Sequence, residues 1–120
     1  MEIYKKFTFD SAHYLPFVPD DHKCRRVHGH TYSVRLFIKG DLDPKLGWVA
    51  DFGDLKAAWR PIEKQLDHHM LNEVPGLENP TAENIAIWIW RKIKPDLPLL
   101  SKVEVCENAT SGVLYAGEYE

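Results

Sequence analysis

Two stretches of the chain alternate between apolar and polar positions, which is the pattern of strands with one buried face. They are residues 3–12 and residues 28–39, and the second alternates more clearly than the first. Between them, residues 15–27 contain two prolines and a cluster of charges, which indicates a long loop of the kind that carries functional sites. The side chains expected on the shared faces are Phe7, Phe9, Ser11 and His13 in the first stretch and His28, His30, Tyr32, Val34, Leu36 and Ile38 in the second.

Two later stretches repeat apolar residues at the three- and four-residue spacing of amphipathic helices. The first, residues 52–66, follows Asp51 in the N-cap position, and Pro61 is expected to kink or interrupt it. The second, residues 82–93, follows Thr81 as its N-cap and is closed by prolines.

Alternation returns near the C-terminus, in residues 101–109 and 112–119, around a Thr-Ser-Gly turn. The predicted order of elements is therefore ββααββ, an α+β fold. At 120 residues and 44% apolar composition the chain can build one hydrophobic core. No internal repeat or linker composition interrupts it, so residues 1–120 are expected to form a single domain.

The charge balance argues against some classes of partner. With 15 basic and 18 acidic side chains the formal net charge is -3, which provides no positive field for phosphate backbones or anionic lipids. The first residues lack the apolar core of a signal peptide, and no apolar run approaches the roughly 18 residues that span a bilayer. We therefore expect a cytoplasmic protein with no nucleic-acid or membrane partner. Its two cysteines, Cys24 and Cys106, are expected to stay thiols, and a bridge between them is disfavoured.

Histidines give the strongest sign of chemistry. His28 and His30 lie two residues apart on one predicted strand, so both imidazoles point to the same side. Antiparallel pairing of the first two strands would bring His13 to them, and three histidines with an open fourth position are typical of catalytic zinc. Two alternatives stay open: histidines that make only hydrogen bonds, and a closed site with Cys24 as fourth ligand, although no second cysteine lies near it.

Cys24 itself is a candidate for chemistry. Its neighbours Lys23, Arg25 and Arg26 are cations, which favour the thiolate, the form that can accept a proton. A packing role is the alternative for any cysteine. It suits Cys106 better, and that residue is assigned no role.

Two acidic residues complete the candidate chemistry. Asp67 precedes His68 at a helix end, where a carboxylate can orient an imidazole and raise its basicity for a proton relay. A helix cap and a solvated pair is the alternative. Glu107 ends an apolar row on its strand and marks either the sheet margin or the floor of a pocket for a donor-rich ligand, such as a guanidine-like heterocycle. His22 and His69 are assigned no role.

Together these features resemble the 6-pyruvoyl-tetrahydropterin synthase family, and within it the bacterial branch that forms 6-carboxy-tetrahydropterin for queuosine biosynthesis. The likeness covers nearly the whole chain. A Cys-x3-His-Gly-His motif with an upstream SAH, a downstream LDHH and a late strand glutamate is highly specific. The matching segments are FTFDSAHYLP, HKCRRVHGHTYSV, GWVADFGDLK, LDHHMLN, PGLENPTAENIAIWIW and CENATSG.

The resemblance implies the tunnelling fold (T-fold), a four-stranded antiparallel sheet with two helices on one face. Such chains assemble through sheet edges into barrels, typically as a homohexamer of two trimers. The implied reaction converts 7,8-dihydroneopterin triphosphate into 6-carboxy-5,6,7,8-tetrahydropterin, acetaldehyde and triphosphate, with Zn2+ as cofactor. The alternatives are the pyruvoyl synthase reaction, which releases no acetaldehyde, and a non-catalytic metal-binding assembly module. Another branch of the family, which catalyses a retro-aldol reaction, has glutamate in place of the thiol. The presence of Cys24 argues against that reaction.

The resemblance also assigns roles to individual side chains: three zinc ligands, a proton acceptor, a proton relay and two contacts to the pterin ring. The zinc ligands fall on His13, His28 and His30, and the proton acceptor falls on Cys24. The proton relay falls on Asp67 and His68. The contacts to the pterin ring fall on Glu107 and on Thr81, which reaches the pterin from a neighbouring subunit. Lys23, Arg25 and Arg26 are candidate contacts for the triphosphate.

Overall fold

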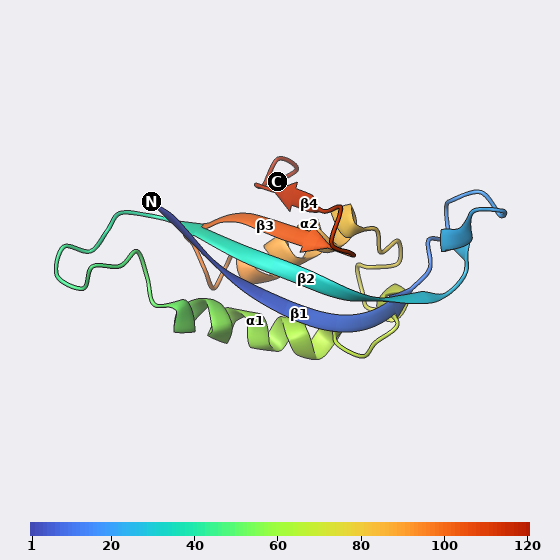
Figure 1. Cartoon of the computed structure of the whole chain (residues 1–120), viewed down its shortest axis with the longest axis horizontal. Coiled ribbons are helices and arrows are strands. Elements are labelled where there is room, and N and C mark those ends of the chain that lie inside the picture. The colour runs from blue at the N-terminus through green and yellow to red at the C-terminus, as the bar shows by residue number, and fades with distance from the viewer.

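A computed structural model describes residues 1–120. The strands form one antiparallel sheet in the order β1-β2-β3-β4, and both helices lie on the same side of it (Figure 1). The predicted ββααββ order and the four-stranded sheet are therefore confirmed. The elements are β1 (Glu2–His13), β2 (His28–Lys39), α1 (Phe52–Leu66), α2 (Ala82–Ile93), β3 (Leu100–Cys106) and β4 (Val113–Tyr115), with two single-turn 3-10 helices, η1 (Lys23–Arg25) and η2 (Leu71–Glu73).

The core lies between the sheet and the helices. Alternate side chains of β2, including Tyr32 and Leu36, are fully buried, while α1 contributes Trp59 and α2 contributes Ile89. The aromatic ring of Phe9 in β1 stacks on Tyr32 with 4.8 Å between ring centroids. Burial of these apolar surfaces fixes which face of each strand points inward.

The register of β1 and β2 decides where the candidate ligands lie. All twelve residues of β1 pair with β2, so that His13 at the end of β1 lies opposite His28 at the start of β2. Ser11 lies opposite His30. The three histidines predicted as ligands therefore meet at one end of the sheet.

Helix α1 runs through Pro61 without interruption, so the expected break is absent. The helix begins at the predicted cap, where the Asp51 carboxylate accepts a hydrogen bond of 2.8 Å from the Gly53 N–H. A proline inside a helix costs about 3 kcal/mol. Four buried side chains on the inner face, each contributing about 2 kcal/mol, outweigh that cost, and Pro61 itself faces solvent.

The last two strands are shorter than the alternation predicted. Strand β3 ends before Asn108, because the Asn108 side chain accepts hydrogen bonds from two backbone N–H groups of the following turn. Strand β4 ends before Gly117, where the chain turns with a positive φ of 85°. A Cβ at Gly117 would lie 2.8 Å from the Trp90 ring, so only glycine fits there. Alternating polarity alone does not reveal these two local constraints.

Two long loops extend the molecule beyond its sheet, giving overall dimensions of 57 × 26 × 25 Å. Residues 14–27 form the loop at the end of the sheet where the three histidines lie, and residues 40–51 form the loop at the opposite end (Figure 1). None of the helices has the length and apolar character needed to cross a membrane. The first loop matters most here, because it carries Cys24.

Candidate active site

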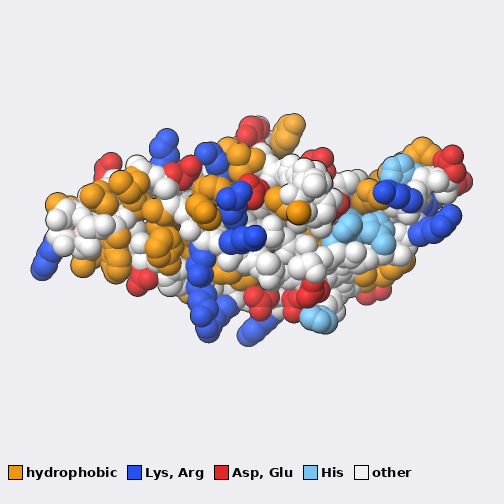
Figure 2. All heavy atoms as spheres, viewed as in Figure 1, with side chains coloured by type: hydrophobic (Ala, Val, Ile, Leu, Met, Phe, Trp, Pro, Cys, Tyr) orange, Lys and Arg blue, Asp and Glu red, His pale blue; other side chains and the backbone are white.

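His13, His28 and His30 form a compact cluster. Their ligand atoms all lie within 4.8 Å of one another, close enough for a single metal ion to be held between them. Figure 2 shows histidine side chains gathered at the end of the sheet, with lysine and arginine side chains of the long loop beside them. The predicted convergence of these three residues is therefore present in the fold.

The hydrogen bonds of the cluster leave its Nε2 atoms free to bind a metal. The Nδ1 of His13 donates to the Pro80 carbonyl at 2.8 Å, and the Nδ1 of His28 donates to the Arg26 carbonyl at 2.7 Å. The two Nε2 atoms then lie only 3.0 Å apart with their lone pairs facing each other. Such a contact is repulsive unless a cation lies between the rings, and the Nε2 of His30, which is buried without a partner, completes the set.

The electrostatic environment favours neutral imidazoles in this cluster. Burial, the largest effect, lowers the pKa of His13, which is 1% exposed. Burial also lowers the pKa of His30. Neutral imidazole is the form that binds metals, so the two lowered pKa values suit a metal site.

Glu107 lies at the edge of the histidine cluster. Its carboxylate oxygens are 4.0 Å from the Nε2 of His13 and 3.8 Å from the Nε2 of His30, too far for hydrogen bonds. The residue follows the last residue of β3, at the end of the apolar row. Its sequence position left two interpretations open, the sheet margin and a pocket. The geometry favours the pocket, because Glu107 lines one.

Cys24 lies apart from the three histidines, since the cluster that could hold one metal ion does not include its sulfur. The residue is half-buried in η1, where the imidazole of His22 accepts a hydrogen bond of 3.1 Å from the Cys24 N–H. Its carbonyl accepts a hydrogen bond from the Leu15 N–H, which ties the two arms of the loop together. A closed four-ligand site is not formed within the chain.

Asp67 and His68 form the predicted pair at the end of α1. One carboxylate oxygen of Asp67 accepts a hydrogen bond of 2.8 Å from the Nδ1 of His68, and the other accepts one of 2.9 Å from the Asp10 N–H. The Asp10 carbonyl in turn accepts a hydrogen bond from the His68 N–H at 2.6 Å. Strand β1 therefore fixes both members of the pair, and His68 takes a left-handed backbone conformation with φ 57°.

The hydrogen bonds around Asp67 shift both pKa values. Donation from the Asp10 backbone, followed by that from His68, lowers the pKa of Asp67. The hydrogen bond to Asp67 raises the pKa of His68, whose side chain is 78% exposed. The arrangement stabilises a carboxylate beside a charged, accessible imidazole.

A shallow pocket of about 670 Å³ connects this pair with the metal cluster. His30 lines one part of it, and His68 and His69 line another. His68 of the pair and His30 of the cluster therefore face a common space, although they arise from segments far apart in the sequence. Its lining residues are Asp10, Ser11, Ala12, Gly29, His30, Thr31, His68, His69 and Met70.

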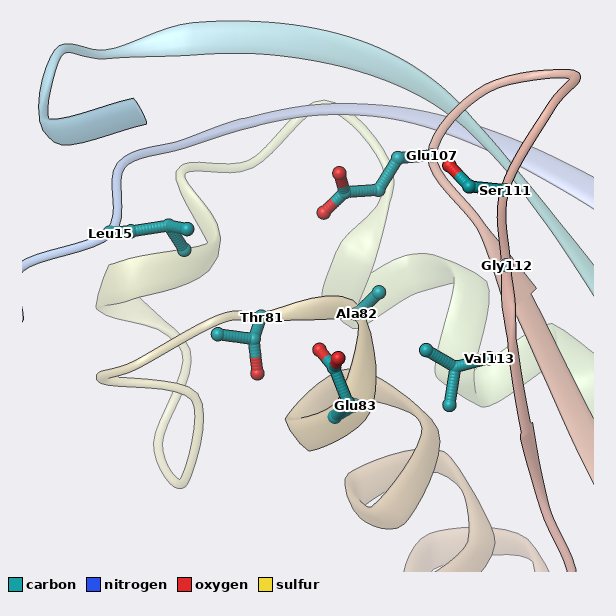
Figure 3. A pocket seen from close by; sticks show the side chains of 8 residues that line it. All are labelled: Leu15, Thr81, Ala82, Glu83, Glu107, Ser111, Gly112 and Val113. Carbon is teal, nitrogen blue, oxygen red and sulfur yellow. The ribbon is translucent and has the colours of Figure 1, made fainter. Parts of the chain in front are cut away.

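A second pocket, of about 400 Å³, is lined by Glu107. In Figure 3 the Glu107 carboxylate enters it from the end of β3, while Thr81 and Glu83 enter from the beginning of α2. Thr81 also caps α2, its hydroxyl accepting a hydrogen bond from the Asn84 N–H. Within one chain, Thr81 thus shares a pocket with Glu107, and its predicted contribution to a neighbouring subunit stays a prediction.

The sequence interpretation missed Glu83 and the unpaired hydroxyl of Tyr32. An acidic residue in the first turn after a helix cap normally serves the helix dipole, so Glu83 gave no separate signal. Its two-residue spacing from Thr81 is the only hint that both would face one pocket. Tyr32 looked like an ordinary member of the apolar row of β2.

Comparison with known proteins adds to this geometry. The family described as 6-pyruvoyl tetrahydropterin synthase matches residues 2–118. The chain belongs to this family. It is 44% identical to the 6-carboxy-5,6,7,8-tetrahydropterin synthase of Synechocystis, over 94% of this chain and 91% of that protein.

Other members of the 6-pyruvoyl tetrahydropterin synthase family are also similar. The dihydroneopterin monophosphate aldolase of Pyrococcus furiosus is 38% identical over 88% of this chain and 89% of that protein. Among solved structures, the 6-pyruvoyl tetrahydropterin synthase of Caenorhabditis elegans superimposes with a TM-score of 0.89 at 26% identity, covering 98% of this chain and 96% of that one. The T-fold expected from the sequence is confirmed.

Proposed function

We propose that the protein is a zinc-dependent lyase that converts 7,8-dihydroneopterin triphosphate and one water molecule into 6-carboxy-5,6,7,8-tetrahydropterin, acetaldehyde and triphosphate. The observation that carries the proposal is the group of three facing imidazoles beside a pocket with two carboxylates. Similarity to the Synechocystis enzyme supports this choice of product. In the cell the reaction would serve queuosine biosynthesis, in the cytoplasm.

Zinc is the metal proposed for His13, His28 and His30. Three nitrogen ligands with an open fourth position are the donor set of catalytic zinc sites. A zinc ion bound there would act as a Lewis acid toward the hydroxyls of the substrate side chain and make the adjacent C–H bonds more acidic. Two of the histidines have their Nδ1 atoms fixed by carbonyl groups, which orients the Nε2 atoms toward the ion.

Protons are proposed to move at two groups outside the ligand set. Cys24, as thiolate, accepts a proton from the substrate side chain, and His68, oriented by Asp67, exchanges protons on the other side. The raised pKa of His68 supports this role, because it keeps a proton available on the imidazole near neutral pH. These roles need a substrate that reaches from the histidine cluster toward both groups.

The pocket of Figure 3 is proposed to hold the pterin ring. The ring presents N–H donors along one edge, and the carboxylates of Glu107 and Glu83 can accept hydrogen bonds from them. The hydroxyl of Thr81 adds a further polar contact. Fixing the ring here would hold the side chain over the metal cluster, since Glu107 lies about as close to His13 as to His30.

The triphosphate is proposed to meet the cations of the long loop. Lys23 and Arg26 are exposed beside Cys24. Arg25 is held by its own loop, because its guanidinium donates to the Val18 carbonyl at 2.8 Å and lies 3.3 Å from Asp20. Lys23 and Arg26 are therefore the better candidates of the three.

A homohexamer of two trimers is proposed as the assembly. Support comes from two features of the sheet: the face opposite the helices is not covered, and β1 is a long edge strand. Open strand edges pair readily with strands of other chains. Mass measurement of the purified protein in solution tests the subunit number.

Product analysis tests the proposed reaction. The zinc-loaded protein is incubated with 7,8-dihydroneopterin triphosphate, and acetaldehyde and triphosphate are both measured. We expect the two in equal amounts. Triphosphate without acetaldehyde would instead assign the pyruvoyl synthase reaction, which the C. elegans structural relative makes the second candidate.

A further inference from the structure

Two buried polar side-chain atoms lack any hydrogen-bond partner, the Nε2 of His30 and the hydroxyl of Tyr32. Buried polar groups are almost always paired, so each orphan calls for a physical reason. A metal at the histidine cluster accounts for His30. Nothing in the proposed reaction uses Tyr32.

The Tyr32 ring is held firmly beside the cluster. It is fully buried and stacks on Phe9 at 4.8 Å. It also meets the rings of His13 and His30 edge to face, with centroid distances of 5.9 Å and 5.5 Å. A ring packed on three sides cannot swing its hydroxyl into bulk water, so a partner has to come to it.

Glu107 lies next to Tyr32 across the sheet, because Ser33 pairs with Cys106 and Tyr32 and Glu107 are the residues that follow this pair in the antiparallel register. Its carboxylate lies against the same two imidazoles as the Tyr32 ring, at 4.0 Å and 3.8 Å. No direct hydrogen bond joins the Tyr32 hydroxyl to the carboxylate. A buried water between the two oxygens would satisfy both groups.

We propose that Tyr32 is a positioning residue whose hydroxyl donates a hydrogen bond, through one buried water, to the Glu107 carboxylate. The bond fixes the direction in which the carboxylate meets the N–H edge of a pterin ring. The proposal rests on the proposed function only in that Glu107 contacts the ring. A phenylalanine would fill the same space but would leave the carboxylate free to turn toward the histidines.

Two matched variants test the role, because the chain contains a second buried tyrosine, Tyr115, that lines neither pocket of the site. The hydroxyl of Tyr115 donates to Glu120 at 2.6 Å and accepts from the Tyr119 N–H at 3.0 Å. Neopterin, whose ring is fluorescent, is titrated into wild type, Tyr32→Phe and Tyr115→Phe, and the Tm and zinc content of each are measured.

We expect opposite results for the two variants. Tyr32→Phe should weaken neopterin binding about tenfold, the effect of one lost hydrogen bond to a charged group, with Tm and zinc content close to wild type. Tyr115→Phe should lower the Tm and leave neopterin binding unchanged. Neopterin binding by Tyr32→Phe at wild-type affinity would overturn the proposal.

A double-mutant cycle with Glu107→Ala, which removes the acceptor altogether, shows whether Tyr32 acts through Glu107. In the Glu107→Ala background, Tyr32→Phe should cause no further loss of neopterin affinity, whereas an undiminished tenfold loss would overturn the water-mediated link. The two proposals fail separately. A wild-type protein that binds neopterin but releases no acetaldehyde contradicts the lyase assignment and leaves the effect of Tyr32→Phe on binding intact.

Discussion

The partly buried histidine cluster and the more exposed Asp67–His68 pair use the same side chain in opposite ways. Burial lowers the pKa of His13 and His30, which keeps their lone pairs free. A hydrogen bond to Asp67 raises the pKa of His68, which keeps a proton on it. Residue type alone therefore does not assign a role: a histidine whose pKa is lowered by burial suits a metal, and one on the surface beside a carboxylate suits proton transfer.

Both groups depend on the same end of β1. His13 is its last residue, and Asp10 holds Asp67 and His68 through its backbone N–H and carbonyl groups. The strand thus sets the distance between the histidine cluster and the Asp67–His68 pair. Variants that change one group without the other test whether the two groups have separate roles.

Removal of one imidazole from the cluster should have the largest effect. We expect His28→Ala to lose stoichiometric zinc and to lower turnover by about 10³-fold, since a Lewis-acid metal contributes several kcal/mol. Metal analysis of the purified protein and an acetaldehyde assay measure the two effects. His69→Ala is the control and should keep its zinc, so equal metal loss in both variants would contradict the assignment of ligands.

Removal of the thiol should separate chemistry from metal binding. We expect Cys24→Ala to keep its zinc and to lose about 10²-fold in turnover, the usual contribution of a positioned base. Cys106→Ala is the matched control and should behave like wild type. Zinc loss in Cys24→Ala as severe as in His28→Ala would establish a fourth ligand. Unchanged turnover would exclude Cys24 as the base, and a lack of turnover in wild type as well would point to a non-catalytic metal-binding module.

Replacement of the carboxylate should act on the exposed pair alone. Asp67 raises the pKa of His68, so Asp67→Asn should lower that pKa and move the alkaline limb of the pH–rate profile to lower pH. Activity at neutral pH should fall about tenfold with zinc retained. An alkaline limb that stays in place would assign it to another group.

The same variant predicts a pH dependence of stability. Because the folded pKa of His68 is raised, its stabilising contribution is present in acid and is lost as the pH rises through that value. The lowered pKa of Asp67 sets the lower limit, since that contribution is lost as the pH falls through it. The Tm difference between wild type and Asp67→Asn should therefore be larger at pH 5.5 than at pH 9.

The smallest effect concerns the backbone of the pair. His68 has a φ of 57°, a conformation that costs a side-chain-bearing residue more than glycine. We expect His68→Gly to have a Tm about 3 to 5 °C above that of His68→Ala. At the neighbouring residue, which lacks a positive φ, His69→Gly should instead have a lower Tm than His69→Ala.

Alternation and spacing predicted much of this structure. The second strand and both helices have the expected bounds, because each buries one regular face against the core. Pairing of β1 with β2 then brought His13 to His28 as expected. These features follow from the spacing and the polarity of the residues, which can be read directly from the sequence.

The remainder depends on contacts between distant segments. The end of β4 is set by Gly117 packing on Trp90, which belongs to another element. Likewise, the closeness of Glu83 to Glu107 arises only when the beginning of α2 meets the end of β3. The unpaired hydroxyl of Tyr32 can be recognised only once its surroundings are known. No local sequence pattern predicts such contacts between distant segments.

The pairing of His13 with His28 also has a consequence for folding. A slip of one residue between β1 and β2 would turn the side chain of His13 away from the other two histidines, because side chains alternate along a strand. An ion held by all three would thus bind only the correctly aligned sheet, and by mass action it would favour that alignment over every shifted one. The metal would in this way select the correct register of β1 and β2 before it takes part in any reaction.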